Sequence, residues 1–179
     1  MDILKDYNVR PIEEKDLELI LKWRNSPRVH NMMLTEHIIT SEEHRAWFFR
    51  NNHNNPSRNL IFEYQGETIG YIGYTEYDTE KNSCSPSIYL GDNDKMPPNA
   101  GIQLCITSII YAFDVLKVDA LRTEVLQDNK VSYNLSTLLG YSCVGYSFVI
   151  KNEKKISTCI LELKKSDREK NRWLKKYEF

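Results

Sequence analysis

The sequence predicts an α/β (α+β) protein with a mixed, mostly antiparallel sheet and helices on both of its faces. The predicted elements follow the order strand, two helices, three strands, helix, strand, helix, two strands. Consecutive strand candidates joined by short polar turns predict antiparallel hairpins. The strand–helix–strand unit over residues 85–126 predicts a right-handed crossover between two parallel strands.

The first third of the chain contains one strand and two helices. Residues 8–12 form a strand candidate that ends at Pro11, and apolar residues from Leu17 to Trp23 share one helical face. That helix should end before Pro27, because the residue preceding a proline resists the α conformation. Thr40, followed by acidic residues in the next turn, predicts the cap of the second helix.

The remaining elements are read from alternating apolar residues and from turn residues. Strands are expected at residues 58–64, 68–77, 85–90, 120–126, 142–150 and 156–163, and helices at 102–116 and 130–139. Gly140 is expected to end the second of these helices. A basic tail at 164–179 closes the chain, and we expect it to form a solvated helix.

Length and composition predict one domain over residues 1–179. A chain of 179 residues falls within the roughly 100–200 residues of a typical domain. The formal net charge of -1 argues against broad nucleic-acid binding. We expect no signal peptide and no membrane segment. The four cysteines form no C-x-x-C pair, so free thiols in a reducing cytoplasm are expected.

The loop at residues 91–101 leads into the long Ile-rich helix and predicts an anion site. A helix start carries unpaired N–H groups and a partial positive charge. Asn99, Ala100 and Gly101 are small enough to let a phosphate approach the backbone. An ordinary helix start is the structural alternative.

Four short motifs resemble the GCN5-related N-acetyltransferase (GNAT) family in content and order. They lie at residues 111–116 (YAFDVL), 121–125 (LRTEV), 129–132 (NKVS) and 138–141 (LLGY). Residues 21–27 and 41–44 are similar to two branches of that family: the aminosugar N-acetyltransferases of pseudaminic-acid-type pathways and the ribosomal-protein N-terminal acetyltransferases. The resemblance covers about residues 17–163 and implies the GNAT fold, whose sheet splays into a V-shaped slot.

The resemblance implies acetyl-CoA as the cosubstrate and no metal. The family's pyrophosphate loop falls on Pro98, Asn99, Ala100, Gly101, Ile102 and Gln103, of which Gly101 alone matches the family pattern. Ile88, Tyr89 and Leu90 would lie along the pantetheine arm, with a backbone N–H near Leu90 facing the thioester oxygen. Asn129 and Ser132 match positions that contact the coenzyme near its thiol.

The resemblance also implies catalytic positions. The family's general acid, a tyrosine seven residues after the motif asparagine, corresponds to Ser136, so Tyr133, one turn earlier, is a candidate substitute. A thiolate leaving group with a pKa of about 8.5 needs little help from an acid. Glu76, late on its strand, is the candidate base. Packing at the sheet edge for Tyr133 and a solvated charge for Glu76 are the structural alternatives.

For the acceptor, Trp23, Arg24 and Asn25 are the candidate binding residues, because an aromatic ring, a guanidinium and an amide can stack on a ring and hold a phosphate. The alternatives are a core position for Trp23 and a surface ion pair for Arg24. No H-E-x-x-H motif occurs among the four histidines, so no metal site is expected.

The leading functional interpretation is acetyl-CoA-dependent N-acetylation of a small-molecule amine, and the first choice of acceptor is a nucleotide-linked aminosugar. The alternatives are acetylation of a protein N-terminus and a non-catalytic acyl-CoA-binding module. The expected partner is the small-molecule amine. We expect the protein to bind neither nucleic acid nor a membrane, and a homodimer is compatible with the sequence.

Overall fold

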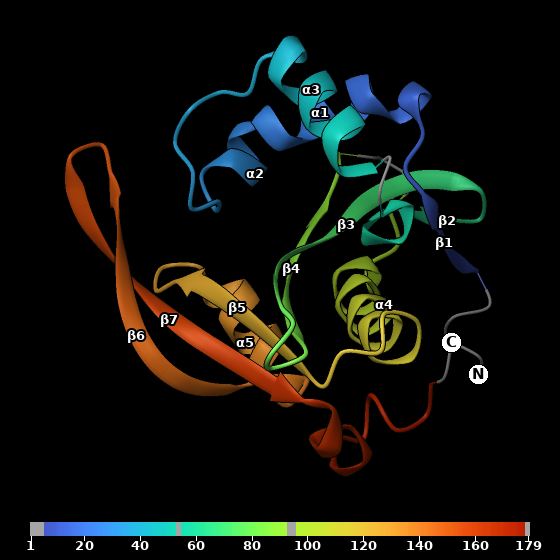
Figure 1. The fold of residues 1–179 in the computed structure, drawn as a ribbon, viewed down its shortest axis with the longest axis vertical. Coiled ribbons are helices and arrows are strands. Elements are labelled where there is room, and N and C mark those ends of the chain that lie inside the picture. Colours follow the sequence, from blue (N-terminus) through green and yellow to red (C-terminus); the bar gives the residue numbers. More distant parts are fainter. Residues whose placement is uncertain (1–5, 53–54, 93–95, 178–179) are drawn as a thin grey trace. The chain divides into compact units, whose positions relative to one another are not determined.

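The fold is described from a computed structural model, in which residues 6–52, 55–92 and 96–177 are described (Figure 1). In chain order the elements are β1 (Tyr7–Pro11), η1 (Glu14–Asp16), α1 (Leu17–Asn25), α2 (Pro27–His30), α3 (Ser41–Asn52), η2 (Pro56–Arg58), β2 (Asn59–Tyr64), β3 (Glu67–Asp78), β4 (Ser83–Leu90), α4 (Ala100–Asp114), β5 (Ala120–Leu126), α5 (Lys130–Leu138), β6 (Ser142–Lys151), β7 (Lys154–Lys164) and η3 (Lys165–Lys170).

The strands form a mixed sheet of seven strands in the order β1-β2-β3-β4-β5-β7-β6. The pairs β1–β2, β2–β3, β5–β7 and β6–β7 are antiparallel, and β4–β5 is parallel. The predicted fold class and the predicted parallel pairing of β4 with β5 are therefore confirmed, and the right-handed sense of the crossover stays a prediction.

The chain divides into two compact units. Unit 1 comprises Met1–Asn31, His37–Gly73 and Ile88–Leu104, and unit 2 comprises Met32–Glu36, Tyr74–Ser87 and Cys105–Phe179. Strands β3 and β4 and helix α4 each contribute residues to both. The expectation of one domain over residues 1–179 stays a prediction.

Unit 1 is built around the apolar faces of α1 and α3. Ile12, Leu17, Ile20, Phe48, Ile61 and Tyr71 form one buried cluster. At its edge the Arg10 guanidinium donates to both carboxylate oxygens of Asp16, at 2.7 and 2.8 Å, and to Glu63 at 2.7 Å. These bonds tie β1 to the turn before α1 and to β2.

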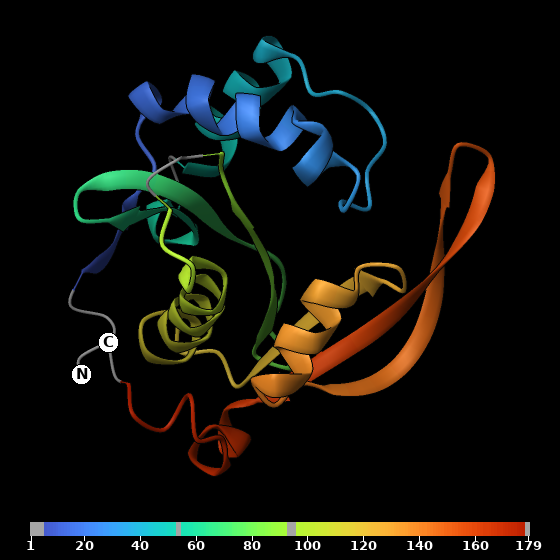
Figure 2. The same cartoon turned by 180° about the vertical axis from the view of Figure 1, so that it is seen from behind.

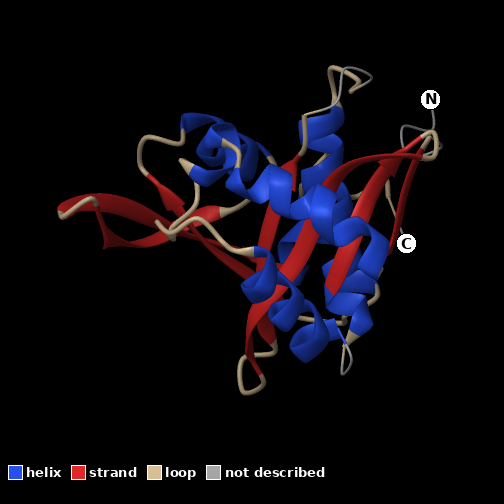
Figure 3. Ribbon diagram, turned by 90° about the horizontal axis from the view of Figure 1, so that it is seen from above, coloured by secondary structure: helices blue, strands red, loops and turns tan. Residues whose placement is uncertain are grey.

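Unit 2 contains the long β6–β7 hairpin, drawn in orange and red in Figure 2; Figure 3 draws all strands in red. The register slips by one residue between Cys143 and Gly145, which marks a β-bulge. Strand β6 ends the strand order, so its outer edge is unpaired within the described chain.

The basic tail differs from expectation at Arg168. A solvated helix was predicted, but Arg168 is 8% exposed, and its guanidinium binds Asp114 at 2.5 Å and the carbonyl oxygen of Tyr177. The cause is a partner on α4, 54 residues earlier in the chain, that satisfies the buried charge.

Local signals placed most helix ends correctly. Thr40 and Glu43 form a reciprocal capping box at the start of α3, with N–H to side-chain oxygen distances of 2.8 and 3.2 Å. Gly140, at φ +97°, ends α5 in the left-handed conformation. The short helix α2 was not predicted, although Pro27 stands at its start, where proline is favoured.

Candidate functional site

The loop before α4 is anchored by side-chain and backbone hydrogen bonds. The Tyr7 hydroxyl donates to the Asn99 side-chain oxygen at 2.9 Å, and the Ala100 N–H donates to the Pro97 carbonyl at 3.0 Å. The first i→i−4 bond of the helix runs from the Gln103 N–H to the Asn99 carbonyl at 3.1 Å. The N–H groups of Gly101 and Ile102 therefore have no acceptor within the helix.

Gly101 leaves open space beside these N–H groups. A Cβ built on Gly101 would meet only the Leu90 Cδ1 atom, at 4.0 Å. Gln103, one turn into α4, is 3% exposed, and its side-chain oxygen has no hydrogen-bond partner within the described part of the chain. A buried polar atom normally has a hydrogen-bond partner, so this side-chain oxygen is available to a bound donor. In the sequence, Gln103 stood out only as a departure from the family pattern.

Tyr89 of β4 stacks on an aromatic ring and interacts electrostatically with a cation in unit 1. Its ring stacks on Tyr71 at 5.1 Å, and burial raises the pKa of Tyr89 well above its usual value. Arg24 of α1 interacts electrostatically with Tyr89, and burial lowers the pKa of its guanidinium. The structure thus brings one predicted acceptor residue beside one predicted cosubstrate residue. Because its charge is partly desolvated, Arg24 would gain from an anionic ligand.

The other two predicted acceptor residues hold the local structure. Trp23 is 3% exposed, and its ring lies directly over the backbone of Gly91. The Asn25 amide donates to the Ile39 carbonyl at 2.8 Å and accepts from the Ile39 N–H at 3.0 Å. The burial of Trp23 and its contact with Gly91 agree with the packing alternative, and acceptor binding by Trp23, Arg24 and Asn25 stays a prediction.

Arg28 of α2 was missed by the sequence reasoning. Its guanidinium contacts Asp92 at 3.1 Å and the Leu90 carbonyl at 3.3 Å. It therefore holds the end of β4, where the predicted oxyanion-binding N–H lies. The signal available in the sequence was its place directly after Pro27, at the start of a short helix.

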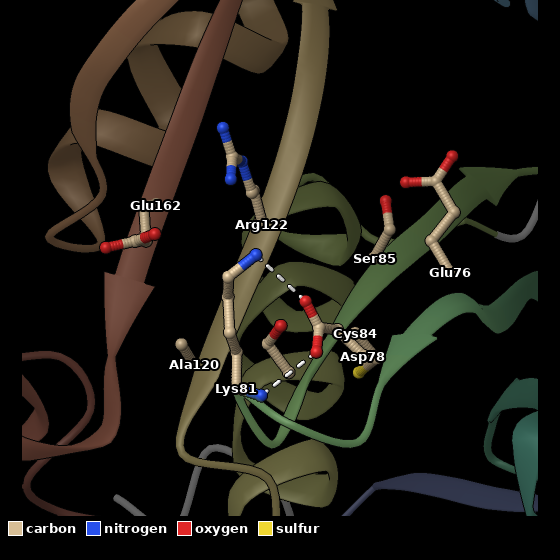
Figure 4. A pocket seen from close by; sticks show the side chains of 9 residues that line it. Glu76, Asp78, Lys81, Cys84, Ser85, Ala120, Arg122 and Glu162 are labelled. Atoms are coloured by element: carbon tan, nitrogen blue, oxygen red, sulfur yellow. Dashed lines mark hydrogen bonds and ion pairs between the residues drawn. The ribbon is translucent and has the colours of Figure 1, made fainter.

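Glu76 of β3 lines a pocket in unit 2 (Figure 4). Its backbone has φ +50°, a left-handed conformation that is costly for a residue other than glycine and that is found at functional sites. The cavity has a volume of about 140 Å³ and is lined by Glu76, Asp78, Lys81, Ser83, Cys84, Ser85, Ala120, Arg122 and Glu162.

The pocket carries both signs of charge. Three carboxylates, Glu76, Asp78 and Glu162, stand with two cations, Lys81 and Arg122. Lys81 pairs with Asp78 at 3.0 Å, and Arg122 and Glu162 face each other across the β5–β7 ladder. Such a lining can attract an ammonium group and a phosphate of one ligand. The residues come from β3, β4, β5, β7 and the turn between β3 and β4, so only Glu76 was recognised in the sequence.

The parallel pairing of β4 with β5 is short. The paired residues are Ser83 with Ala120 and Cys84 with Leu121. Pro86 follows two residues later on β4, and proline has no N–H to donate to a ladder. The end of the pairing is consistent with the splay that the family resemblance implies.

Helix α5 carries four predicted site residues. The Asn129 side-chain oxygen accepts the Ser132 N–H at 3.1 Å, so this asparagine caps the helix. Tyr133 and Ser136 lie one turn apart, both partly exposed. Tyr133 interacts electrostatically with Tyr146 of β6. Their cosubstrate and catalytic roles stay predictions.

In the described part of the chain, no group of three or more histidine, cysteine, aspartate or glutamate residues could hold a metal ion. No helix among the described residues is long and apolar enough to cross a membrane.

Comparison with known proteins identifies the family. The family described as "Acetyltransferase (GNAT) domain" matches residues 7–142. Two curated relatives, both named "Acetyltransferase PseH" and from two strains of Campylobacter jejuni, are 32% identical over 136 residues. That match covers 74% of this chain and 81% of each relative.

Solved structures share the fold. A spermidine N-acetyltransferase from Vibrio cholerae, in complex with CoA and spermine, has a TM-score of 0.81 at 18% identity, over 90% of this chain and 96% of that one. The protein yncA from Salmonella typhimurium, solved with its cofactor acetyl-CoA, has a TM-score of 0.72 at 15% identity, over 89% of this chain and 94% of that one. The family match and the curated relatives confirm the predicted resemblance. The chain therefore belongs to the GNAT family and is an N-acetyltransferase.

Proposed function

We propose that the protein transfers the acetyl group of acetyl-CoA directly to a primary amine of a nucleotide-linked aminosugar. The observation that carries the choice of acceptor is the mixed-charge pocket around Glu76, with carboxylates for an ammonium group and cations for a phosphate. The resemblance to aminosugar acetyltransferases and the similarity to the two curated relatives support the same choice.

The cosubstrate is assigned to the start of α4. The N–H groups of Gly101 and Ile102, which have no acceptor within the helix, together with the partial positive charge of a helix start, suit a diphosphate. The open space at Gly101 lets the phosphate oxygens approach the backbone. Asn99, held by the Tyr7 hydroxyl, keeps the loop in place. The residues present therefore fit the diphosphate of acetyl-CoA.

The proposed chemistry is a direct acyl transfer. The neutral amine nitrogen attacks the acetyl carbonyl carbon, an N–C bond forms, and the C–S bond to coenzyme A breaks. Glu76 takes a proton from the amine, and Tyr133 or Ser136 delivers a proton to the leaving thiolate. The Leu90 N–H, on the strand end that Arg28 holds, stabilises the developing oxyanion.

Two variants of Gly101 test the cosubstrate site. Gly101→Glu places charge and bulk against the diphosphate and should abolish the rise in melting temperature that acetyl-CoA causes. Gly101→Ala is the matched control, because the space at this position accepts a methyl group. A wild-type ligand-induced shift in Gly101→Glu would show that the diphosphate binds elsewhere.

The acceptor is tested by thiol release from acetyl-CoA. We expect turnover with UDP-linked aminosugars, none with the same sugars lacking the amine, and none with short peptides. Activity on peptides alone would overturn the aminosugar proposal in favour of protein N-terminal acetylation. No release with either class, in a protein that binds acetyl-CoA, would favour a binding module.

The catalytic roles are tested one at a time. Glu76→Gln keeps the shape of the side chain and should lower kcat most at low pH, where the amine is most protonated. Tyr133→Phe should lower kcat with little change in KM if the phenol is the acid. Unchanged kcat in Tyr133→Phe would leave Ser136 as the candidate proton donor.

We also propose that the chain forms a homodimer through β6. This strand is at the end of the strand order and exposes Phe148 and Ile150 in its second half, away from Cys143. An unpaired edge with apolar side chains can pair with the same edge of a second copy about a two-fold axis. Ile150→Lys should shift sedimentation toward the monomer, whereas Val131→Lys, exposed on α5, should not. A wild-type chain that sediments as a monomer at all concentrations would contradict this.

A further inference from the structure

Two cysteines of unit 2 lie in contact across the β6–β7 hairpin. Cys143 of β6 pairs in register with Leu161, and Cys159 of β7 pairs with Tyr146. The bulge between Cys143 and Gly145 puts Cys143 and Tyr146 on one face of the hairpin, because both stand opposite residues two apart on β7. The two sulfur atoms are 2.7 Å apart.

The two thiols have opposite environments. Cys143 is exposed. The pKa of its thiol is lowered by hydrogen bonds with the Cys159 thiol, with the backbone of Gly145 and with the Tyr146 hydroxyl. Cys159 is 3% exposed, and burial raises its pKa. An exposed thiolate is the sulfur that oxidants attack first, and a buried thiol beside it is placed to resolve the product.

We propose that Cys143 and Cys159 are an oxidation site, at which a hydroperoxide converts the two thiols into an intramolecular disulfide. The Cys143 sulfur attacks the hydroperoxide, so that an S–O bond forms, the O–O bond breaks and the alcohol or water leaves with a proton. The Cys159 sulfur then displaces that oxygen as water, and the S–S bond forms. Two thiols and one hydroperoxide thus give one disulfide, one alcohol (water, if the oxidant is hydrogen peroxide) and one water.

Because their sulfur atoms are in contact, Cys143 and Cys159 should form a disulfide in preference to the other two cysteines of the chain. Cys84 is buried, and burial raises the pKa of Cys105 to about 12. These two residues serve as internal references for reactivity. The bond would link β6 to β7 beside the bulge, where the ladder is interrupted.

The experiment uses the full-length protein and hydrogen peroxide, followed by alkylation of the remaining thiols, proteolysis and mass spectrometry. We expect a peptide pair joined through Cys143 and Cys159, two hydrogens lighter than the reduced pair and restored by dithiothreitol. Cys143→Ser should abolish the linkage completely. Cys159→Ser should leave Cys143 as a sulfenic acid that dimedone traps, and Cys105→Ser should match the wild type.

Unfolding provides the matched control for geometry. In urea the preference for the 143–159 linkage should be lost, because the hairpin no longer holds the sulfurs together. Three results would overturn the proposal: both cysteines still alkylated after peroxide, the same linkage yield in the folded and unfolded chain, or faster oxidation of Cys84 or Cys105. None of these measurements depends on acetyltransferase activity.

Discussion

Gly91→Ala should destabilise unit 1 through a single contact with Trp23. A Cβ at Gly91 would lie 2.0 Å from the Trp23 Cε2 atom and 2.3 Å from two further ring atoms. Carbon atoms in contact prefer about 3.5–4.0 Å, so the overlap is about 1.5 Å. Neither side gives way easily, since Trp23 is buried and the Gly91 N–H is bonded to the Ile69 carbonyl at 2.9 Å.

The expected cost follows from the size of this overlap. Overpacking a core costs about 1–3 kcal/mol, and the overlap places Gly91→Ala near the upper end. Alanine also has less conformational entropy than glycine in the unfolded chain, which stabilises the fold by about 0.5–1 kcal/mol. The free energy of unfolding should therefore fall by about 2 kcal/mol in total. Urea unfolding followed by far-ultraviolet circular dichroism measures this loss, which corresponds to a fall of about 4–8 °C in Tm for a chain of this length.

A double-mutant cycle tests the mechanism. In a Trp23→Leu background the added methyl group has room, so Gly91→Ala should then cost less than about 0.5 kcal/mol. Gly101→Ala is the matched control, since its Cβ meets only Leu90 Cδ1 at 4.0 Å. Equal costs of Gly91→Ala in both backgrounds would refute the reasoning, because the penalty would then not come from the ring.

Three further predictions concern stability. Gly140→Ala should cost about 1–2 kcal/mol in urea unfolding, since φ is +97° and the new Cβ would lie 3.3 Å from Asn171 Nδ2, whereas Gly145→Ala should change little. Burial lowers the pKa of His44, so its contribution to stability is present above the unfolded pKa of about 6.5 and is lost as pH falls. His44→Gln should therefore flatten the decline in Tm between pH 7 and pH 5. Burial disfavours the charged form of Asp16, but hydrogen bonds from Arg10 and the Glu13 N–H outweigh it and lower its pKa. Asp16→Asn should destabilise the wild-type fold by about 2 kcal/mol at pH 7, and the difference should shrink as pH falls below about 4; a constant difference would show that the charge is not responsible.

The elements most accurately predicted are those with signals close in sequence. Strand β5 has the predicted bounds, residues 120–126, and α5 begins at Lys130 as expected. The capping box at Thr40 and the glycine at position 140 act within four residues of the helix ends that they set. Such interactions form from neighbouring residues, so the sequence carries them directly.

The candidate site was predictable only in part. A helix after the loop at residues 91–101 was expected, although α4 begins at Ala100, two residues before the predicted start at Ile102. The position of Glu76 on its strand, β3, was also expected. The residues that share the pocket with Glu76 come from four strands and one turn, and the left-handed backbone at Glu76 has no local signal in the sequence. The sequence allowed two interpretations of Trp23, core packing and acceptor binding, and only the tertiary structure shows that its ring packs on Gly91, 68 residues later.

The sequence by itself determined the order of the helices and strands and, through four short motifs in order, the family. These depend on hydrophobic periodicity, capping residues and turn residues, all of which act over a few positions. Only the tertiary structure decided that Arg168 is buried against Asp114, that Arg28 holds the end of β4 and that Cys143 touches Cys159. Those contacts depend on strand register, on a one-residue bulge and on which distant surfaces meet, which no local pattern specifies.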